Sequence, residues 1–109
     1  TRTYIDGNED FDIYIITWNK YQKSKIQNHS NNGCIYKILQ GHLIEENYDK
    51  NFRLNGIKSL FKDIISYIDD YIHYHKIINS TEQISVSLHI DSPANHQFIT
   101  YDDPPDYIC

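Results

Sequence analysis

The strongest constraint on the fold is the strict alternation of apolar and polar residues from Ile84 to Ile90. Successive side chains of an extended chain point to opposite faces, so a period of two gives one apolar face and one polar face. The segment therefore predicts a β-strand that ends before Ser92-Pro93. The two faces are Ile84, Val86, Leu88 and Ile90 on one side, and Ser85, Ser87 and His89 on the other.

Short apolar or alternating segments recur along the chain and are separated by turn residues. Four of them, at residues 13–18, 34–39, 42–48 and 72–78, predict further strands. Many short strands of this kind favour a sandwich or a small barrel. A small barrel turns alternate residues inward, where ligands and metals can bind, so the position of each histidine within its strand matters.

Residues 57–72 leave two interpretations open. Their apolar residues recur at helical spacing, which fits an amphipathic helix. The same segment could equally form two short strands separated at Asp69-Asp70. The apolar positions are Ile57, Leu60, Phe61, Ile64, Ile65 and Ile68.

Composition excludes several classes of protein. A chain of 109 residues with a net charge of −5 is long enough for one domain, and its acidic balance argues against binding to nucleic acid. No apolar run approaches the length of a membrane span, and no signal peptide opens the chain. Two cysteines, Cys34 and Cys109, do not make a disulfide framework, which favours a reducing, cytoplasmic location. The absence of methionine and the start at Thr1 suggest a trimmed or partial chain.

The histidines need individual interpretation, because a single histidine is more often a structural or exposed side chain than a metal ligand. His42, beside a turn glycine, and His96 are interpreted in this way. Spacing singles out others, in three motifs: Gln27-x-His29, Cys34 with Gly41 seven positions later, and His75 with Asn79 four positions later.

These motifs resemble the two cupin motifs. Cys34 stands where the first cupin motif usually has an acid, and in this the chain resembles the cysteine dioxygenase family of thiol dioxygenases. The segments "CIYKILQG", "SYIDDYIHYHKIIN" and "VSLHIDSP" also resemble that family, and so does the position of Arg2. The similarity covers nearly the whole chain and corresponds to the C-terminal two-thirds of the family. It implies an all-β, cupin-type small β-barrel (a double-stranded β-helix or jelly roll) at residues 1–103, followed by an exposed tail at 104–109.

The resemblance also implies a chemistry. In the family a non-haem ferrous ion is held by three histidines, and cysteine and O2 react there to give a sulfinic acid. Neutral imidazole and soft sulfur are suitable ligands for Fe(II). The metal positions fall here on Gln27, His29 and His75. The substrate carboxylate would be bound by Arg2, and the catalytic positions fall on Cys34, Ser87, His89 and Asp91.

Two of these positions depart from the family. Gln27 stands where the first histidine ligand is expected, and an amide oxygen is a weaker ligand for Fe(II) than imidazole, so iron would be weakly bound or absent. Asp91 stands where the family has a tyrosine that is often cross-linked to the cysteine, so Cys34 should remain a free thiol. Asp91 could instead complete a two-histidine, one-carboxylate triad, but its side chain is short, and the family tyrosine is not a ligand. His73 alternates in phase with His75 and is interpreted as a pocket-lining or edge histidine.

Two functions follow. The first is an iron-dependent thiol dioxygenase with a weakened metal site, acting on a small thiol such as cysteine, or on a different thiol because Asp91 alters the charge of the pocket. The second is an inactive cupin that serves as a binding or structural module. The interpretation further predicts that Gln27, His29 and His75 converge on one interior point and, from the resemblance, that the Ser92–Pro93 peptide bond is cis.

Overall fold

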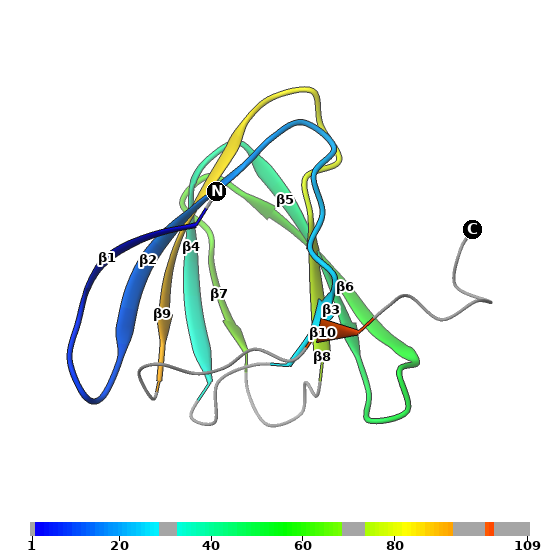
Figure 1. The fold of residues 1–109 in the computed structure, drawn as a ribbon. Helices are drawn as coiled ribbons and strands as arrows, with labels where there is room; N and C mark the ends of the chain where they lie inside the picture. The colour runs from blue at the N-terminus through cyan, green and yellow to red at the C-terminus, as the bar shows by residue number, and fades with distance from the viewer. Residues whose placement is uncertain (1, 29–32, 69–73, 93–99, 102–109) are drawn as a thin grey trace.

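The described part of the chain forms two antiparallel β-sheets that face each other (Figure 1). The computed structural model describes residues 2–28, 33–68, 74–92 and 100–101. The first sheet has the order β1 (Arg2–Gly7), β2 (Asp12–Trp18), β9 (Ser85–Asp91), β4 (Cys34–Gln40) and β7 (Ile65–Ile68). The second has the order β10 (Thr100–Tyr101), β3 (Ile26–Gln27), β8 (Tyr74–Ile78), β5 (His42–Tyr48) and β6 (Leu54–Phe61). The expectation of an all-β fold is confirmed.

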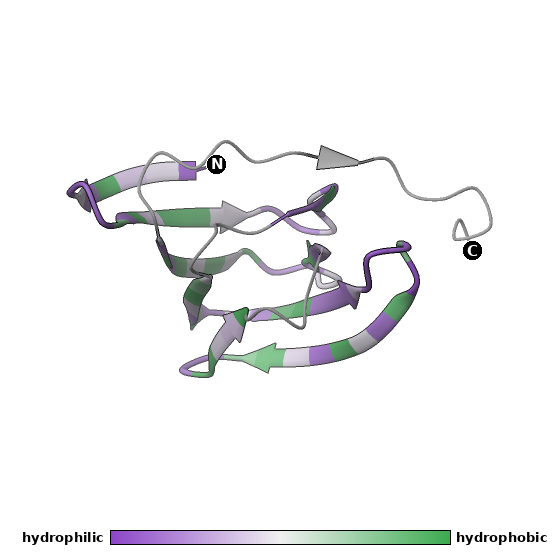
Figure 2. Ribbon diagram, turned by 90° about the horizontal axis from the view of Figure 1, so that it is seen from below, coloured by the Kyte–Doolittle hydropathy of each residue, from purple (hydrophilic) through white to green (hydrophobic). Residues whose placement is uncertain are grey.

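Most of the predicted strands are present within one or two residues of their expected bounds. β5 matches its predicted range, and β2, β4, β8 and β9 differ from theirs only at the ends. The alternation of apolar and polar residues from Ile84 to Ile90 corresponds to the two faces of β9, with Ser87 and His89 buried and Ile90 exposed. Hydrophilic and hydrophobic residues also alternate along other strands (Figure 2).

The helical interpretation of residues 57–72 is wrong. β6 covers its first part, β7 follows, and the two strands are separated at Lys62-Asp63. Asp63 adopts a φ of 72°, a left-handed conformation that aspartate tolerates better than most residues. The turn is closed by a hydrogen bond from the Ile64 N–H to the carbonyl of Phe61. The other possible break, Asp69-Asp70, lies outside the described residues.

β1 was not predicted, because a strand without a buried face shows no regular alternation of apolar and polar residues. It is an edge strand, exposed along nearly its whole length, and it pairs with β2 from Arg2 opposite Ile16 to Gly7 opposite Asp12. This pairing fixes Arg2 beside the inner strands of the first sheet.

The apolar core lies between the two sheets. Both sheets contribute to it, because every second residue of a strand points towards the opposite sheet. The cluster consists of Trp18, Cys34, Tyr36, Ile38, Leu43, Leu60, Ile68 and Ile77, with Ile16 packed against it. No helix in the described part of the chain is long and apolar enough to cross a membrane.

Asn79 ties the second sheet to the first. Its side-chain amide lies within 3.1 Å of the Trp18 and Asn19 carbonyls and 2.8 Å of the Gln83 carbonyl, and its carbonyl oxygen accepts from Thr81. The asparagine of the His-x-x-x-Asn motif is therefore a structural residue, which anchors the end of β8.

Candidate active site

The inner face of β9 is polar, which is unusual for a strand in the middle of a sheet. Ser85, Ser87, His89 and Asp91 are all buried, whereas the outer residues of the strand are apolar and partly exposed. Buried polar groups need partners, because desolvation without a hydrogen bond is costly. The partners that these residues find, on both sheets, define the site.

His89 lies between two tyrosine rings. Tyr14 on β2 and Tyr36 on β4 stack on it with centroid distances of 5.1 Å and 4.9 Å and interplanar angles of 9° and 8°. These strands are the two neighbours of β9, and Tyr14 and Tyr36 are the register partners of His89. Burial, followed by the electrostatic effects of His75 and Arg2, lowers the pKa of His89 to about 3. The imidazole is therefore neutral at physiological pH.

A hydrogen-bond chain fixes the orientation of this imidazole. The Trp18 indole N–H donates to Ser87 Oγ at 2.9 Å, and Ser87 Oγ lies 2.7 Å from His89 Nε2. Because the hydroxyl accepts from Trp18, its own proton is free to be donated to Nε2. We therefore assign the proton of the neutral ring to Nδ1.

Asp91, at the end of β9, also contacts Tyr14. Its Oδ2 accepts a hydrogen bond of 2.6 Å from the Tyr14 hydroxyl and lies 4.0 Å from Nη2 of Arg2. The Arg2 guanidinium also lies 3.9 Å from the centroid of the Tyr14 ring, which is a cation–π contact. Arg2, Tyr14 and Asp91 therefore form one cluster of charge and hydrogen bonds.

Cys34 is a free thiol, as predicted, and it is buried opposite Asp91 across β4 and β9. Burial raises its pKa, and the negative charge of Asp91 and a hydrogen bond to it raise that pKa further. The protonated thiol is thus the form that this environment favours.

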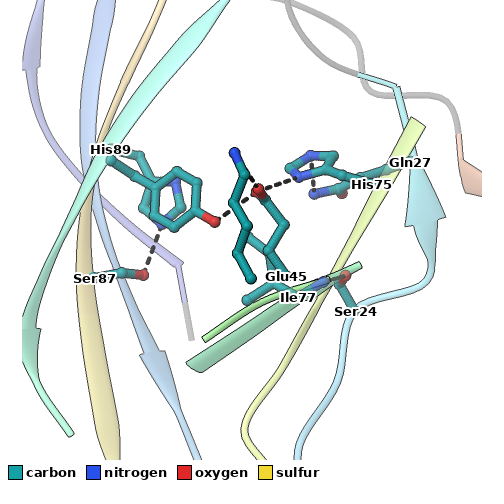
Figure 3. Close-up of polar contacts among 9 residues, drawn as sticks. Ser24, Gln27, Glu45, His75, Ile77, Ser87 and His89 are labelled. Carbon is teal, nitrogen blue, oxygen red and sulfur yellow. Dashed lines mark hydrogen bonds and ion pairs between the residues drawn. The ribbon is translucent and has the colours of Figure 1, made fainter. Parts of the chain in front are cut away.

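His75 occupies the opposite wall of the site, on β8 (Figure 3). It is 4% exposed, and its Nδ1 lies 3.4 Å from Oε2 of Glu45 on the neighbouring strand β5. A carboxylate can only accept, so this contact places the proton on Nδ1 and leaves the lone pair of Nε2 available. A carboxylate behind a histidine in this way is the usual outer partner of a metal-binding imidazole.

Glu45 is a buried carboxylate whose Oε2 is hydrogen-bonded and whose Oε1 faces a lysine. Tyr36 donates to its Oε2 at 2.5 Å, and Lys58 Nζ lies 3.5 Å from its Oε1. Burial alone would raise the pKa of Glu45, but the hydrogen bond and charge of His75, together with Tyr36 and Lys58, outweigh it and leave the pKa below its ordinary value. Glu45 is therefore ionised, and Tyr36 links it to the His89 stack on the other sheet.

Gln27 lies directly beside His75. The two residues are register partners on β3 and β8, and Gln27 Nε2 is 3.3 Å from His75 Nε2. The chain before β3 is held by Ser24, whose N–H donates to the Ile77 carbonyl and whose Oγ accepts from the Ile77 N–H, both at 2.9 Å. With the proton of His75 on Nδ1, the Nε2 atom accepts a hydrogen bond from the side-chain amide N–H of Gln27.

Two adjoining cavities open between these walls. The inner one, of about 20 Å³, has room for about one water molecule. The outer one has a volume of about 250 Å³ and includes Arg2 and Trp18 in its lining. Both are bounded by Tyr14, Ile16 and Gln27. The remaining lining of the inner cavity is Cys34, His75, Ile77, His89 and Asp91.

The structure brings most of the predicted site residues to this region. Gln27 and His75 meet, as expected, but the third predicted ligand, His29, lies outside the described residues. His73, His96, the Ser92–Pro93 bond and Cys109 lie outside them too. Asp91 contacts Tyr14 and Arg2, and the described ranges contain no group of three His, Cys, Asp or Glu side chains that could hold a metal ion.

Sequence reasoning missed three members of the site: Tyr14, Tyr36 and Glu45. Each sits at an inward position of an alternating strand, in phase with a residue that was recognised as buried or functional. Glu45 carried the clearest signal, because a glutamate flanked by inward Leu43 and Asn47 is an acid on a buried face. Its partners are distant in sequence, so its role needed the fold.

Comparison with known proteins identifies the family. The family model "Cysteine dioxygenase type I" matches residues 1–104. The chain belongs to the cysteine dioxygenase type I family. It is 32% identical to cysteine dioxygenase type 1 of Danio rerio over 94% of this chain and 55% of that protein. It is 37% identical to the human cysteine dioxygenase type 1 over 85% of this chain and 50% of that protein. The chain thus spans about half the length of these relatives.

Solved structures show the same fold at low identity. A Klebsiella pneumoniae protein with a double-stranded β-helix domain matches with a TM-score of 0.77 at 13% identity, covering 94% of this chain and 84% of that one. A cupin superfamily protein from Desulfitobacterium hafniense matches with a TM-score of 0.69 at 12% identity, over 84% and 75% of the two chains. The cupin fold predicted from the family resemblance is therefore confirmed.

Proposed function

We propose that this cysteine dioxygenase-related cupin is an iron-dependent thiol dioxygenase. The observation that carries the proposal is His75, buried with its Nδ1 on the ionised Glu45 and its Nε2 facing the pocket beside Gln27. A buried imidazole oriented by a carboxylate fits a metal ligand better than a core residue. The reaction is R–SH + O2 → R–SO2H, in which both oxygen atoms enter the product.

The donors beside the pocket fit a ferrous ion. His75 Nε2 and the amide oxygen of Gln27, once the amide is turned, would hold it together with His29, which the family resemblance assigns as a ligand. Imidazole nitrogen and neutral oxygen are acceptable donors for Fe(II), although an amide oxygen is weaker than a second or third imidazole. The ion, when bound, would supply the redox chemistry by which a thiol reacts with dioxygen.

The other residues of the site would prepare the thiol for reaction. Arg2, at the outer cavity, would bind and orient the polar end of the substrate. His89, neutral and held by Ser87, would present an N–H to the pocket region without adding charge. Ile16 and Ile77, which line the inner cavity, would restrict access of bulk water.

A second candidate, an inactive binding module, is favoured by the two substitutions Gln27 and Asp91. Iron content and thiol-dependent oxygen uptake of the purified protein separate the candidates. The proposal expects iron in the protein and the formation of one sulfinic acid per O2 consumed. Stable, folded protein that takes up no iron and consumes no O2 with any small thiol would support the binding module instead.

A further inference from the structure

The pocket already contains a carboxylate beside the arginine that would bind the carboxylate of an amino-acid substrate. Asp91 is 2% exposed, and its Oδ2 lies between the Tyr14 hydroxyl and the Arg2 guanidinium. Arg2 is the residue expected to bind a substrate carboxylate, and its charge is offset by Asp91. A carboxylate that entered the site would have to compete with Asp91 for Arg2 and would approach a like charge.

The second oxygen of the same carboxylate is left without a strong donor. Oδ1 of Asp91 is buried and receives no hydrogen bond from an N–H or O–H of the described residues. The neighbouring Cys34 thiol is only a weak donor. A buried carboxylate oxygen is best satisfied by a charged donor, because such hydrogen bonds are stronger than neutral ones. The ammonium group of a ligand would meet this requirement.

The location of Asp91 makes this requirement relevant to a ligand. Asp91 and Cys34 line the inner cavity together with His75 and Gln27, the proposed iron side of the site. The adjoining outer cavity, of about 250 Å³, is large enough for a molecule of a few heavy atoms to enter. Because Gln27 lines both cavities, a small thiol in the outer cavity could reach Gln27 with its sulfur and place a group the size of one water molecule, such as an ammonium, beside Asp91 in the inner cavity.

We propose that this pocket selects small aminothiols, which carry an ammonium group and no carboxylate, over cysteine. The oxidation of these thiols rests on the proposed function, whereas the preference for an aminothiol over cysteine rests on Asp91 and Arg2. In the reaction the S–H bond and the O–O bond break, and each oxygen atom of O2 forms a bond to sulfur. The sulfur gives up four electrons, O2 accepts them, and the proton is carried by the sulfinic acid or released.

Three small thiols test the selectivity. They are 2-aminoethanethiol, which has the amine alone, 3-mercaptopropanoic acid, which has the carboxylate alone, and cysteine, which has both. Binding is measured anaerobically, with and without added ferrous ion, by titration calorimetry. The fluorescence of Trp18, the single tryptophan of the chain, serves as a local reporter because Trp18 lines the outer cavity. We expect 2-aminoethanethiol to bind at least about tenfold more tightly than cysteine, a difference of about 1.4 kcal/mol.

Asp91→Asn removes the charge and retains the size of the side chain. It should reduce the preference for 2-aminoethanethiol over cysteine to about one or reverse it. Asp63→Asn, a matched change of an exposed acid in the β6–β7 turn, should leave the preference unchanged. Circular dichroism shows whether the variants fold, and the wild-type preference remains decisive if Asp91→Asn does not.

Several outcomes would overturn the selectivity. They are tighter or equal binding of cysteine by the wild type, the same preference in a folded Asp91→Asn variant, and no binding of any of the three thiols. Sulfinate formation is measured separately by mass spectrometry. Selective binding without oxidation would defeat the proposed function and leave the selectivity intact, whereas faster oxidation of cysteine would support the function and defeat the selectivity.

Discussion

The two walls of the pocket are built differently, although both bury charge. The wall on the second sheet places Glu45 behind His75. Tyr36 donates to Oε2 of Glu45, and Oε1, which receives no hydrogen bond from the described residues, has the Lys58 ammonium 3.5 Å away. The wall on the first sheet carries Asp91, whose Oδ1 has no strong donor in the described ranges. The first arrangement is typical of a site that orients a ligand atom, whereas the second has an acceptor left for something else. The comparison suggests that one wall holds the metal and the other recognises the substrate.

Replacement of the two buried histidines should give the largest contrast between the walls. His75→Ala removes a proposed ligand and should reduce iron affinity by more than about 100-fold, beyond the effect of losing an outer partner. His89→Ala, on the other wall, should leave iron content near that of the wild type. Iron per folded chain, measured by atomic absorption after dialysis, checks both. Equal iron in the two variants would end the assignment of separate roles.

Glu45 should act on iron through His75. Glu45→Gln keeps the size of the side chain but removes the negative charge that favours the proton on Nδ1 of His75. Iron affinity should therefore fall by about 10- to 100-fold. Asp91→Asn is the matched change on the other wall and should alter iron affinity much less. Competition with a colorimetric chelator measures both affinities. A larger loss for Asp91→Asn than for Glu45→Gln would reverse the roles of the walls.

Acid should destabilise the metal-free protein through His89. Its folded pKa of about 3 lies below the ordinary value of 6.5, so the unfolded chain binds the additional proton between these pH values. Stability should therefore fall as the pH is lowered from about 6.5 towards 3, with a contribution approaching about 1.4 kcal/mol per pH unit from this group. Urea unfolding at several pH values compares the wild type with His89→Gln. The variant should show the shallower slope, and parallel slopes would contradict the prediction.

The two stacked tyrosines should contribute smaller and comparable amounts to stability. Tyr14→Phe removes the hydrogen bond to Asp91, and Tyr36→Phe removes the one to Glu45. Because both acceptors are buried carboxylates, each change should lower the free energy of unfolding by about 1.5–3 kcal/mol in urea titrations. Only Tyr36→Phe should also weaken iron binding. A matching effect of Tyr14→Phe on iron would show that the two walls are coupled.

The sequence predicted the inner strands well, because each has one buried face. β9 alternates so regularly that its inward residues could be identified without coordinates. β1 escaped prediction because an exposed edge strand has no such pattern. The break between β6 and β7 was not predicted, because Asp63, not a glycine or proline, makes the turn.

The site was predictable only where a residue matched a motif. Gln27 and His75 were expected together and are paired across β3 and β8. The links from Tyr36 to Glu45 and from Tyr14 to Asp91 were not foreseen, because they depend on which strands become neighbours and which side chains reach across the interior. The pairing of Asp91 with Arg2 likewise arises from the position of the unpredicted strand β1.

The central claim, that Gln27 and His75 belong to an iron site weakened by the amide, is tested most directly by restoring an imidazole. Iron per chain is measured for the wild type, Gln27→His, Asp91→Tyr and the double variant, together with oxygen uptake. The account predicts more iron in both variants that carry Gln27→His and little change from Asp91→Tyr alone, because Asp91 does not hold the metal. Near-stoichiometric iron in all four proteins would show that Gln27 is a competent ligand, and near-zero iron in all four would contradict the existence of a metal site.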